Sequence, residues 1–132
     1  MPRQRIATGS PFERLASYSR AVVDGDMIYV SGTVGLDYAT QRIPGGAAEQ
    51  TEQALRNIAD ALAKAHATLA DVLRVRVFIA DRADLMPICE VIGRHFKDVL
   101  PANTTVVSQL ATAEMKVEIE VTARRGSADS VR

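Results

Sequence analysis

The stretch that decides the fold is AAEQTEQALRNIADALAKAH at residues 47–66, followed by TLADVLRVRVFI at residues 68–79. In the first segment, apolar side chains recur every three or four positions, which is the spacing of one face of an α-helix. Residues 72–79 instead form a β-prone run in which arginines alternate with valines, and this indicates a strand. Between the two, Thr68 and Asp71 have the spacing of a capping box. The stretch therefore predicts a helix, a single turn and a strand in direct succession.

Weaker patterns on either side extend this unit. Asp24-Gly25-Asp26 is typical of a tight hairpin turn, because glycine accepts a positive φ without strain. Ser10-Pro11 marks a break, and Asp84 can cap a second helix whose apolar stripe runs to Val99. The further predicted strands are residues 3–7, 19–23, 27–32, 103–108 and 116–123. The order β-β-β-α-β-α-β-β predicts an α+β domain with a mostly antiparallel six-stranded sheet and two helices on one face.

Several of these strands are apolar on both faces. The clearest cases are Met27–Val30, Val77–Ile79 and Val106–Val107. Because two helices can cover only one face of the sheet, the other face must meet something else that is apolar. The most economical cover is a second copy of the chain, so the residues predict an oligomer.

Length and charge limit the classes of protein that fit. The chain has 132 residues, enough for one domain with a sizeable core. We assign residues 1–126 to that domain and predict that the small, polar residues 127–132 form a disordered tail. Lys plus Arg and Asp plus Glu both number 16, so the formal net charge is zero. Nucleic acid and membrane surfaces are therefore not expected as partners, because each would call for a basic excess.

Cysteine and histidine usage is equally restrictive. Cys89 is the single cysteine, which excludes an internal disulfide, and we expect it to be a small buried hydrophobe. With no signal peptide and no apolar run near the roughly 20 residues that span a bilayer, we expect a cytoplasmic protein. His66 and His95 lie too far apart for a metal motif, so no metal is expected. His95 falls on the apolar stripe of the second helix, which predicts a core or cleft-edge position.

The last predicted strand, residues 116–123, carries the residues that can perform chemistry. Its valines and isoleucine share one face, and Glu118 and Glu120 share the other. One interpretation is an ordinary solvated polar face. The other is a carboxylate placed in a cleft between subunits, where it activates water. Spacing alone leaves both interpretations open.

Five segments, together with Gly25, resemble one protein family and follow its order along the chain from Ile6 to Arg125. They are YSRAV (18–22), IYVSG (28–32), QTEQALRNI (50–58), PANTTV (101–106) and VEIE (117–120). Each motif is weak alone, but their order and spacing together resemble the RidA/YjgF family, the reactive intermediate deaminases. This resemblance implies a chorismate-mutase-like fold that assembles as a homotrimer with three ligand clefts between subunits. It also implies hydrolysis of short-lived enamines and imines to ammonia and a 2-keto acid, with no cofactor. Some members are also described as endoribonucleases.

The resemblance also carries over site residues. Glu118 matches the acid that activates or positions water, and the substrate-binding positions are Tyr18, Arg20, Ser31, Gly32, Asn103 and Thr105. Deaminating members have an arginine where this chain has Asn103, and asparagine cannot neutralise a substrate carboxylate. Strand alternation would put Arg20 on the same side as Tyr18, where it could replace that cation. The alternative for Arg20 is a structural pair with a carboxylate.

Two functions from different classes follow. The first is a RidA-like hydrolase that deaminates a small enamine or imine metabolite in an intersubunit cleft, with a substrate altered because Asn103 replaces the arginine. The second is a non-catalytic small-molecule binding or sensor protein that uses the same cleft. RNA cleavage is disfavoured, because zero net charge and six aromatic side chains offer RNA little to hold.

Overall fold

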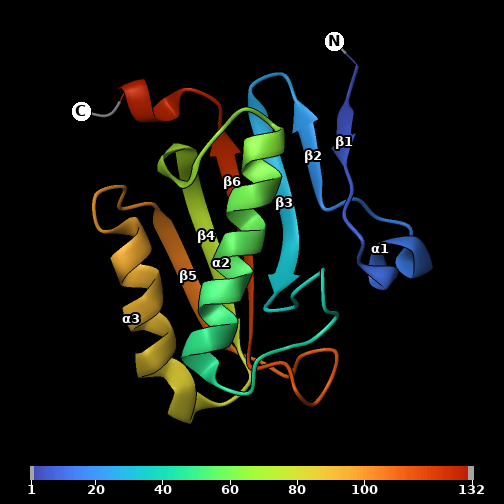
Figure 1. Cartoon of the computed structure of the whole chain (residues 1–132). Coiled ribbons are helices and arrows are strands. Elements are labelled where there is room, and N and C mark those ends of the chain that lie inside the picture. The colour runs from blue at the N-terminus through green and yellow to red at the C-terminus, as the bar shows by residue number, and fades with distance from the viewer. Residues whose placement is uncertain (1, 131–132) are drawn as a thin grey trace.

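The computed structural model describes residues 2–130 and packs two helices against one face of a six-stranded sheet (Figure 1). The strands are β1 (Gln4–Ile6), β2 (Ala21–Asp24), β3 (Met27–Val34), β4 (Val72–Ile79), β5 (Ala102–Val107) and β6 (Val117–Arg124). Their order across the sheet is β1-β2-β3-β6-β4-β5, and every pair is antiparallel except β4 with β5. The α-helices are α1 (Pro11–Ala16), α2 (Ala47–Lys64) and α3 (Leu85–Phe96). The predicted mixed, mostly antiparallel α+β domain is confirmed.

The deciding stretch folds as its periodicity predicts. Helix α2 ends at Lys64, two residues before the predicted limit, and β4 has the predicted bounds. The capping box forms at η1 (Leu69–Asp71), where the Thr68 N–H donates to the Asp71 carboxylate at 3.1 Å. Gly25 takes a φ of 62° in the turn that joins β2 to β3. Local sequence was sufficient here because each of these features depends on neighbours within one or two turns of chain.

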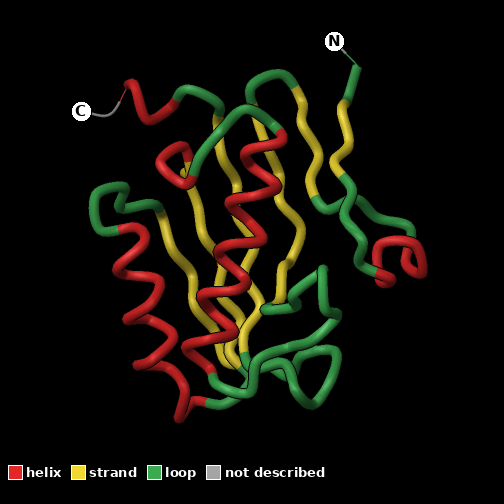
Figure 2. The backbone as a smooth tube through the Cα atoms, in the orientation of Figure 1, coloured by secondary structure: helices red, strands yellow, loops and turns green. Residues whose placement is uncertain are grey.

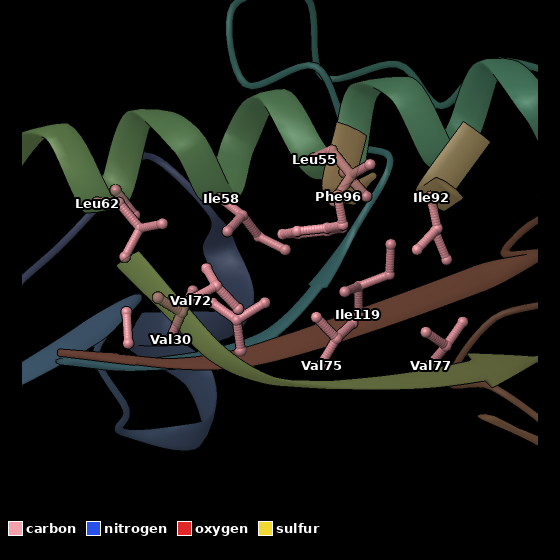
Figure 3. Close-up of a cluster of buried hydrophobic side chains, with 14 of the residues drawn as sticks. Val30, Leu55, Ile58, Leu62, Val72, Val75, Val77, Ile92, Phe96 and Ile119 are labelled. Atoms are coloured by element: carbon pink, nitrogen blue, oxygen red, sulfur yellow. The ribbon is translucent and has the colours of Figure 1, made fainter. Parts of the chain in front are cut away.

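The core lies between the helices and the sheet. Figure 3 shows Leu55, Ile58 and Leu62 of α2 pointing toward the strands, with Phe96 and Ile92 of α3 beside them. On the sheet side of the core, the fully buried side chains are Val75, Val77 and Ile79 of β4 and Val117 and Ile119 of β6. Each fully buried branched side chain contributes about 1.5–3 kcal/mol of transfer free energy. The layer is therefore the main source of stability and fixes the strands that carry the site.

The segment after β1 differs from expectation. Ser10-Pro11 is predicted to be a break, whereas Pro11 begins the six-residue helix α1. Proline is well placed at the first helical position, because its missing N–H would have no partner there. The helix ends at Ala16, and the C-cap residue Ser17 has a left-handed φ of 60°. The expected strand at residues 19–23 accordingly starts later, at Ala21.

The expectations about α3 are only partly met. Asp84 is at the N-cap position of α3 as expected, but its side chain makes no capping bond. The nearby Asp81 caps the preceding turn η2 (Arg82–Asp84), accepting from the Ala83 N–H at 2.9 Å. Cys89 is exposed rather than buried. His95 lies outside the core, and its Nε2 is 2.9 Å from Glu52 of α2. At 3.6 residues per turn, a stripe read from composition can include side chains at its solvent edge.

The face of the sheet away from the helices is mixed rather than continuously apolar. Tyr29 and Val106 are 48% and 42% exposed there. Between them lie charged residues of β4 and β6, including the Arg76–Glu120 pair at 3.0 Å. The expected apolar face is therefore present only in patches, because strand alternation puts the glutamates and arginines on the same side as Tyr29 and Phe78.

The stretch expected to fray, Gly126–Ser130, contains the turn η3 (Ser127–Ser130). Ser127 is buried and its hydroxyl donates to the Asp71 carbonyl oxygen at 2.9 Å, while the Ala128 N–H donates to the Asp71 carboxylate. Residues 131–132 of the predicted tail lie outside the described residues. Within residues 2–130, no helix is long and apolar enough to cross a membrane, and no group of three or more His, Cys, Asp or Glu side chains could hold a metal ion.

Candidate active site

A cavity of about 590 Å³ lies at one end of the sheet, beside α1. Two loops, residues 35–46 and 109–116, close it; both are among the loops that gather beyond the end of β3 in Figure 2. Four of the predicted site residues line this cavity: Tyr18, Arg20, Gly32 and Glu118. The structure therefore brings together residues from three separate segments of the chain: the one before β2, strand β3 and strand β6.

Glu118 is the reactive candidate in this cavity. It lies on the face of β6 away from the helices, opposite Val34 of β3, and is half-buried. Its carboxylate has no hydrogen-bond or ion-pair partner among the described residues. Burial raises the pKa of Glu118 first, and the charge of Glu120 raises it further, while Arg20 opposes both effects. A carboxylate with a raised pKa is a better base near neutral pH than an exposed one.

Gly32 makes room for that carboxylate. It lies in the irregular part of β3, where the register with β6 shifts between Val30 and Thr33. A Cβ atom on Gly32 would stand 2.9 Å from Cδ of Glu118 and 3.0 Å from Oε2. Real Cβ atoms do not come this close to a carboxyl group, so any larger residue would displace Glu118.

Arg20 lines the cavity but is already engaged. It is 3% exposed, and its Nε pairs with Glu13, itself 7% exposed, at 3.3 Å. One Nη donates to Gly32 O at 2.8 Å and Thr33 Oγ1 at 3.0 Å. The other Nη donates to the Tyr18 hydroxyl at 3.4 Å. These bonds use four of the five guanidinium N–H groups, so Arg20 is chiefly structural.

Two tyrosines, Tyr18 and Tyr38, line the cavity together with Arg20. Arg20 Cζ lies 5.6 Å from the centroid of the Tyr18 ring, within cation–π range. Tyr38, on loop 35–46, is half-buried, and burial raises the pKa of its phenol while Arg20 opposes the rise. Both rings present an apolar body to the cavity, and the raised pKa keeps the Tyr38 hydroxyl protonated at neutral pH.

Ser31 does not face the cavity with Glu118. Its hydroxyl donates to the Ser19 carbonyl oxygen at 2.7 Å, which ties β3 to the segment before β2. Ser31 lines a separate, more open depression on the outer side of Tyr18. The Ser31 hydroxyl proton is thus used in this hydrogen bond to Ser19.

Asn103 and Thr105 are not brought to Glu118 within one chain. They lie on β5, at the opposite edge of the sheet from β1, and β4 separates β5 from β6. Asn103 pairs with Val75 and Thr105 with Val77, so both belong to the helix side of the sheet, whereas Glu118 lies on the other side. The Thr105 hydroxyl donates to Asn103 Oδ1 at 2.8 Å. These two residues form an exposed pair at a free edge.

Comparison with known proteins identifies the family to which the chain belongs. The sequence profile of the family described as Endoribonuclease L-PSP matches residues 8–125. The chain belongs to this family, the RidA/YjgF family. It is 33% identical to the 2-iminobutanoate/2-iminopropanoate deaminase of Rattus norvegicus (94% of this chain, 91% of the relative). It is 34% identical to the RutC family protein UK114 of Drosophila melanogaster (97% and 94%).

Solved structures agree with the RidA/YjgF assignment. A member of the YjgF/YER057c/UK114 family from Mycobacterium tuberculosis superposes with a TM-score of 0.85 at 36% identity, covering 93% of this chain and 99% of that one. The YjgF gene product of E. coli superposes with a TM-score of 0.81 at 25% identity, covering 90% and 93%. The predicted YjgF-type fold is therefore confirmed.

Sequence reasoning missed the residues that support this RidA/YjgF site. Glu13 lies on α1, where the sequence predicts a break and gives no sign of a buried carboxylate that pairs with Arg20. Gln50 is 1% exposed, and its Nε2 donates to Pro44 O and Glu114 O, both at 2.8 Å. The Lys116 N–H donates to Gln50 Oε1 at 2.8 Å, so one side chain holds both cavity loops. The available signal was a glutamine four residues before Ala54 on the apolar stripe of α2.

Proposed function

We propose that this RidA/YjgF chain hydrolyses a small enamine or imine, with Glu118 as the catalytic base. The observation that carries the proposal is the unpartnered, half-buried carboxylate of Glu118, whose pKa is raised by burial and by Glu120, on the wall of a cavity. Relatives of the same family at about one-third identity are named imine deaminases, which supports the reaction type. The proposed hydrolysis requires no cofactor.

The chemistry needs one carboxylate and one water. The imine reacts as its protonated form, C=NH₂⁺. Glu118 accepts a proton from water as the water oxygen attacks the C=N carbon, and the π electrons move onto nitrogen. Glu118 then returns this proton to the nitrogen of the carbinolamine. Ammonia departs as the hydroxyl collapses to a carbonyl, and Glu118 passes the hydroxyl proton to the ammonia, which leaves as NH₄⁺. An enamine enters the same route after protonation on carbon gives the iminium ion.

We propose further that the substrate differs from a 2-imino acid. Asn103 stands where deaminating members have an arginine, and it carries no charge. Arg20 is a poor substitute, because Glu13 neutralises it and one N–H alone remains for a ligand. A buried charge-assisted contact that lacks its partner costs several kcal/mol, on the order of hundreds-fold in rate.

The separation of Asn103 and Thr105 from Glu118 supports an intersubunit cleft in a homotrimer. Both residues lie on the free edge strand β5, next to exposed Val106 and Val107. An edge strand with exposed valines favours pairing or packing against another chain. A neighbouring copy that covers this edge would bring its uncharged Asn103–Thr105 pair to the small-molecule site.

The test compares two glutamates on one strand face. An amino-acid or amine oxidase generates the imine, and semicarbazide traps what remains. Glu118→Gln keeps size and loses the base, so turnover should fall by roughly 100-fold or more, whereas Glu120→Gln should be nearly silent. Sedimentation equilibrium should give a trimer for the wild type and both variants. Full activity in Glu118→Gln would contradict the catalytic role of Glu118. Absence of turnover in the wild type would favour the second candidate, a non-catalytic binding protein, which Asn103 also favours.

A further inference from the structure

Among the charged side chains that line the cavity, the Glu118 carboxylate has no compensating cation. Arg20 is neutralised by Glu13 at 3.3 Å, with both groups buried. The remaining lining charges besides Glu118 are Arg42 and Glu114, both exposed and of opposite sign. Glu118 therefore stays as an uncompensated carboxylate, able only to accept hydrogen bonds when ionised. A cation bound against it would favour the ionised form.

The walls around this carboxylate are apolar. Helix α1 contributes Pro11 and Phe12, and the opposite wall contributes Val34, Leu36 and Met115. Phe12 and Tyr18 are 39% and 38% exposed, so their rings are open to a ligand. The volume, about 590 Å³, lies within the ~300–1,000 Å³ typical of pockets for drug-sized ligands. It leaves room for a substrate body well beyond the side chain of a four-carbon imine.

We infer that the substrate is a cationic imine with an aryl or branched alkyl body and no carboxylate, so that the product is an aldehyde or ketone rather than a keto acid. This inference rests on the proposed imine hydrolysis. The iminium N–H groups donate to the Glu118 carboxylate, and the body packs between the ring of Phe12 and that of Tyr18. A substrate carboxylate in the same place would meet Glu118 and no buried free cation among the described residues.

The stoichiometry of this hydrolysis indicates which class of reaction must supply its substrate. R–CH=NH₂⁺ and H₂O give R–CHO and NH₄⁺: one C–O bond forms, the C–N bond breaks, and no electrons are transferred. Glu118 ends as it began. The imine must be supplied by a reaction that oxidises a primary amine, since oxidation of an α-amino acid would leave the carboxylate in place.

Binding tests the charge selection without any turnover. The probes are phenethylammonium and 3-phenylpropanoate, which share a body and differ in the sign of the head group, titrated by calorimetry into the whole protein. We expect phenethylammonium to bind at least ten-fold tighter, and Glu118→Gln to weaken it at least ten-fold. Glu120→Gln is the matched control and should change its affinity less than three-fold. Tighter binding of 3-phenylpropanoate, or no effect of Glu118→Gln on phenethylammonium, would overturn the inference.

Turnover separates this inference from the proposed function. The matched substrates are the imines of phenethylamine and phenylalanine, which differ in one carboxylate, each generated by a flavin oxidase and trapped with semicarbazide. We expect at least ten-fold faster hydrolysis of the carboxylate-free imine. Preference for the phenylalanine imine overturns the carboxylate-free substrate class but leaves imine hydrolysis by Glu118 standing. If neither imine is hydrolysed while phenethylammonium still binds through Glu118, the proposed function fails and the cation selectivity stands.

Discussion

The two faces of strand β6 have opposite properties although they alternate residue by residue. Toward the helices, Val117 and Ile119 are fully buried within the core. On the other face, Glu118 and Glu120 keep part of their surface exposed, and Glu118 has no hydrogen-bond partner among the described residues. The closed face contributes stability and holds the backbone; the open face leaves a carboxylate unsatisfied beside a cavity. Chemistry is possible on the second face because the first one positions it.

The largest expected effect is on the closed face. Ile119→Ala removes a fully buried side chain between β6 and the helices, and should lower the free energy of unfolding by about 2–5 kcal/mol. Thr122→Ala, on the open face of the same strand, should cost less than about 1 kcal/mol. Urea unfolding followed by circular dichroism measures both. Equal losses would mean that the open face is as tightly packed as the closed one.

The next effect lies where the two regions meet. Gln50→Met keeps the volume but removes all three bonds to Pro44, Glu114 and Lys116, at a cost of about 1–3 kcal/mol. The Lys116 amide should then exchange its hydrogen at least ten-fold faster, because it loses its acceptor. The control is Gln109→Met, the same substitution at an exposed position in the loop 109–116 that contains Lys116. It should leave the exchange rate of the Lys116 amide unaltered. Unchanged protection of Lys116 in Gln50→Met would show that other contacts hold the loops.

The smallest effect is the contribution of Glu118, on the open face, to the pH dependence of the free energy of unfolding. Because burial raises the pKa of Glu118 above 4.5, folding disfavours its ionised form. The wild type should therefore lose stability relative to Glu118→Gln as pH rises from below 4.5 through the raised pKa, and the difference should persist at pH 7. Thermal unfolding from pH 3.5 to pH 8 tests this sign. If Glu118→Gln is less stable than the wild type at pH 7, the Glu118 carboxylate has a stabilising partner in the assembled protein.

The sequence by itself determined the features that depend on residues close to one another along the chain. The periodicity of residues 47–66 specified α2, the β run specified β4 with its bounds, and Thr68 and Asp71 specified the turn between them. Alternation along residues 116–123 also put Glu118 and Glu120 on one face, and the ordered motifs identified the family. These succeed because hydrogen bonds and apolar stripes of this kind repeat within a few residues.

Tertiary structure alone decided which of these groups meet. It paired Glu13 with Arg20 and so removed the cation that strand alternation made available. It also turned Ser31 toward Ser19 and left Asn103 on the far edge of the sheet from the cavity. Each outcome depends on where other segments of the chain lie in the fold, or on a helix, α1, that is too short to show a period. Burial and the charges brought near by folding set the pKa of Glu118, and neither can be read along the chain.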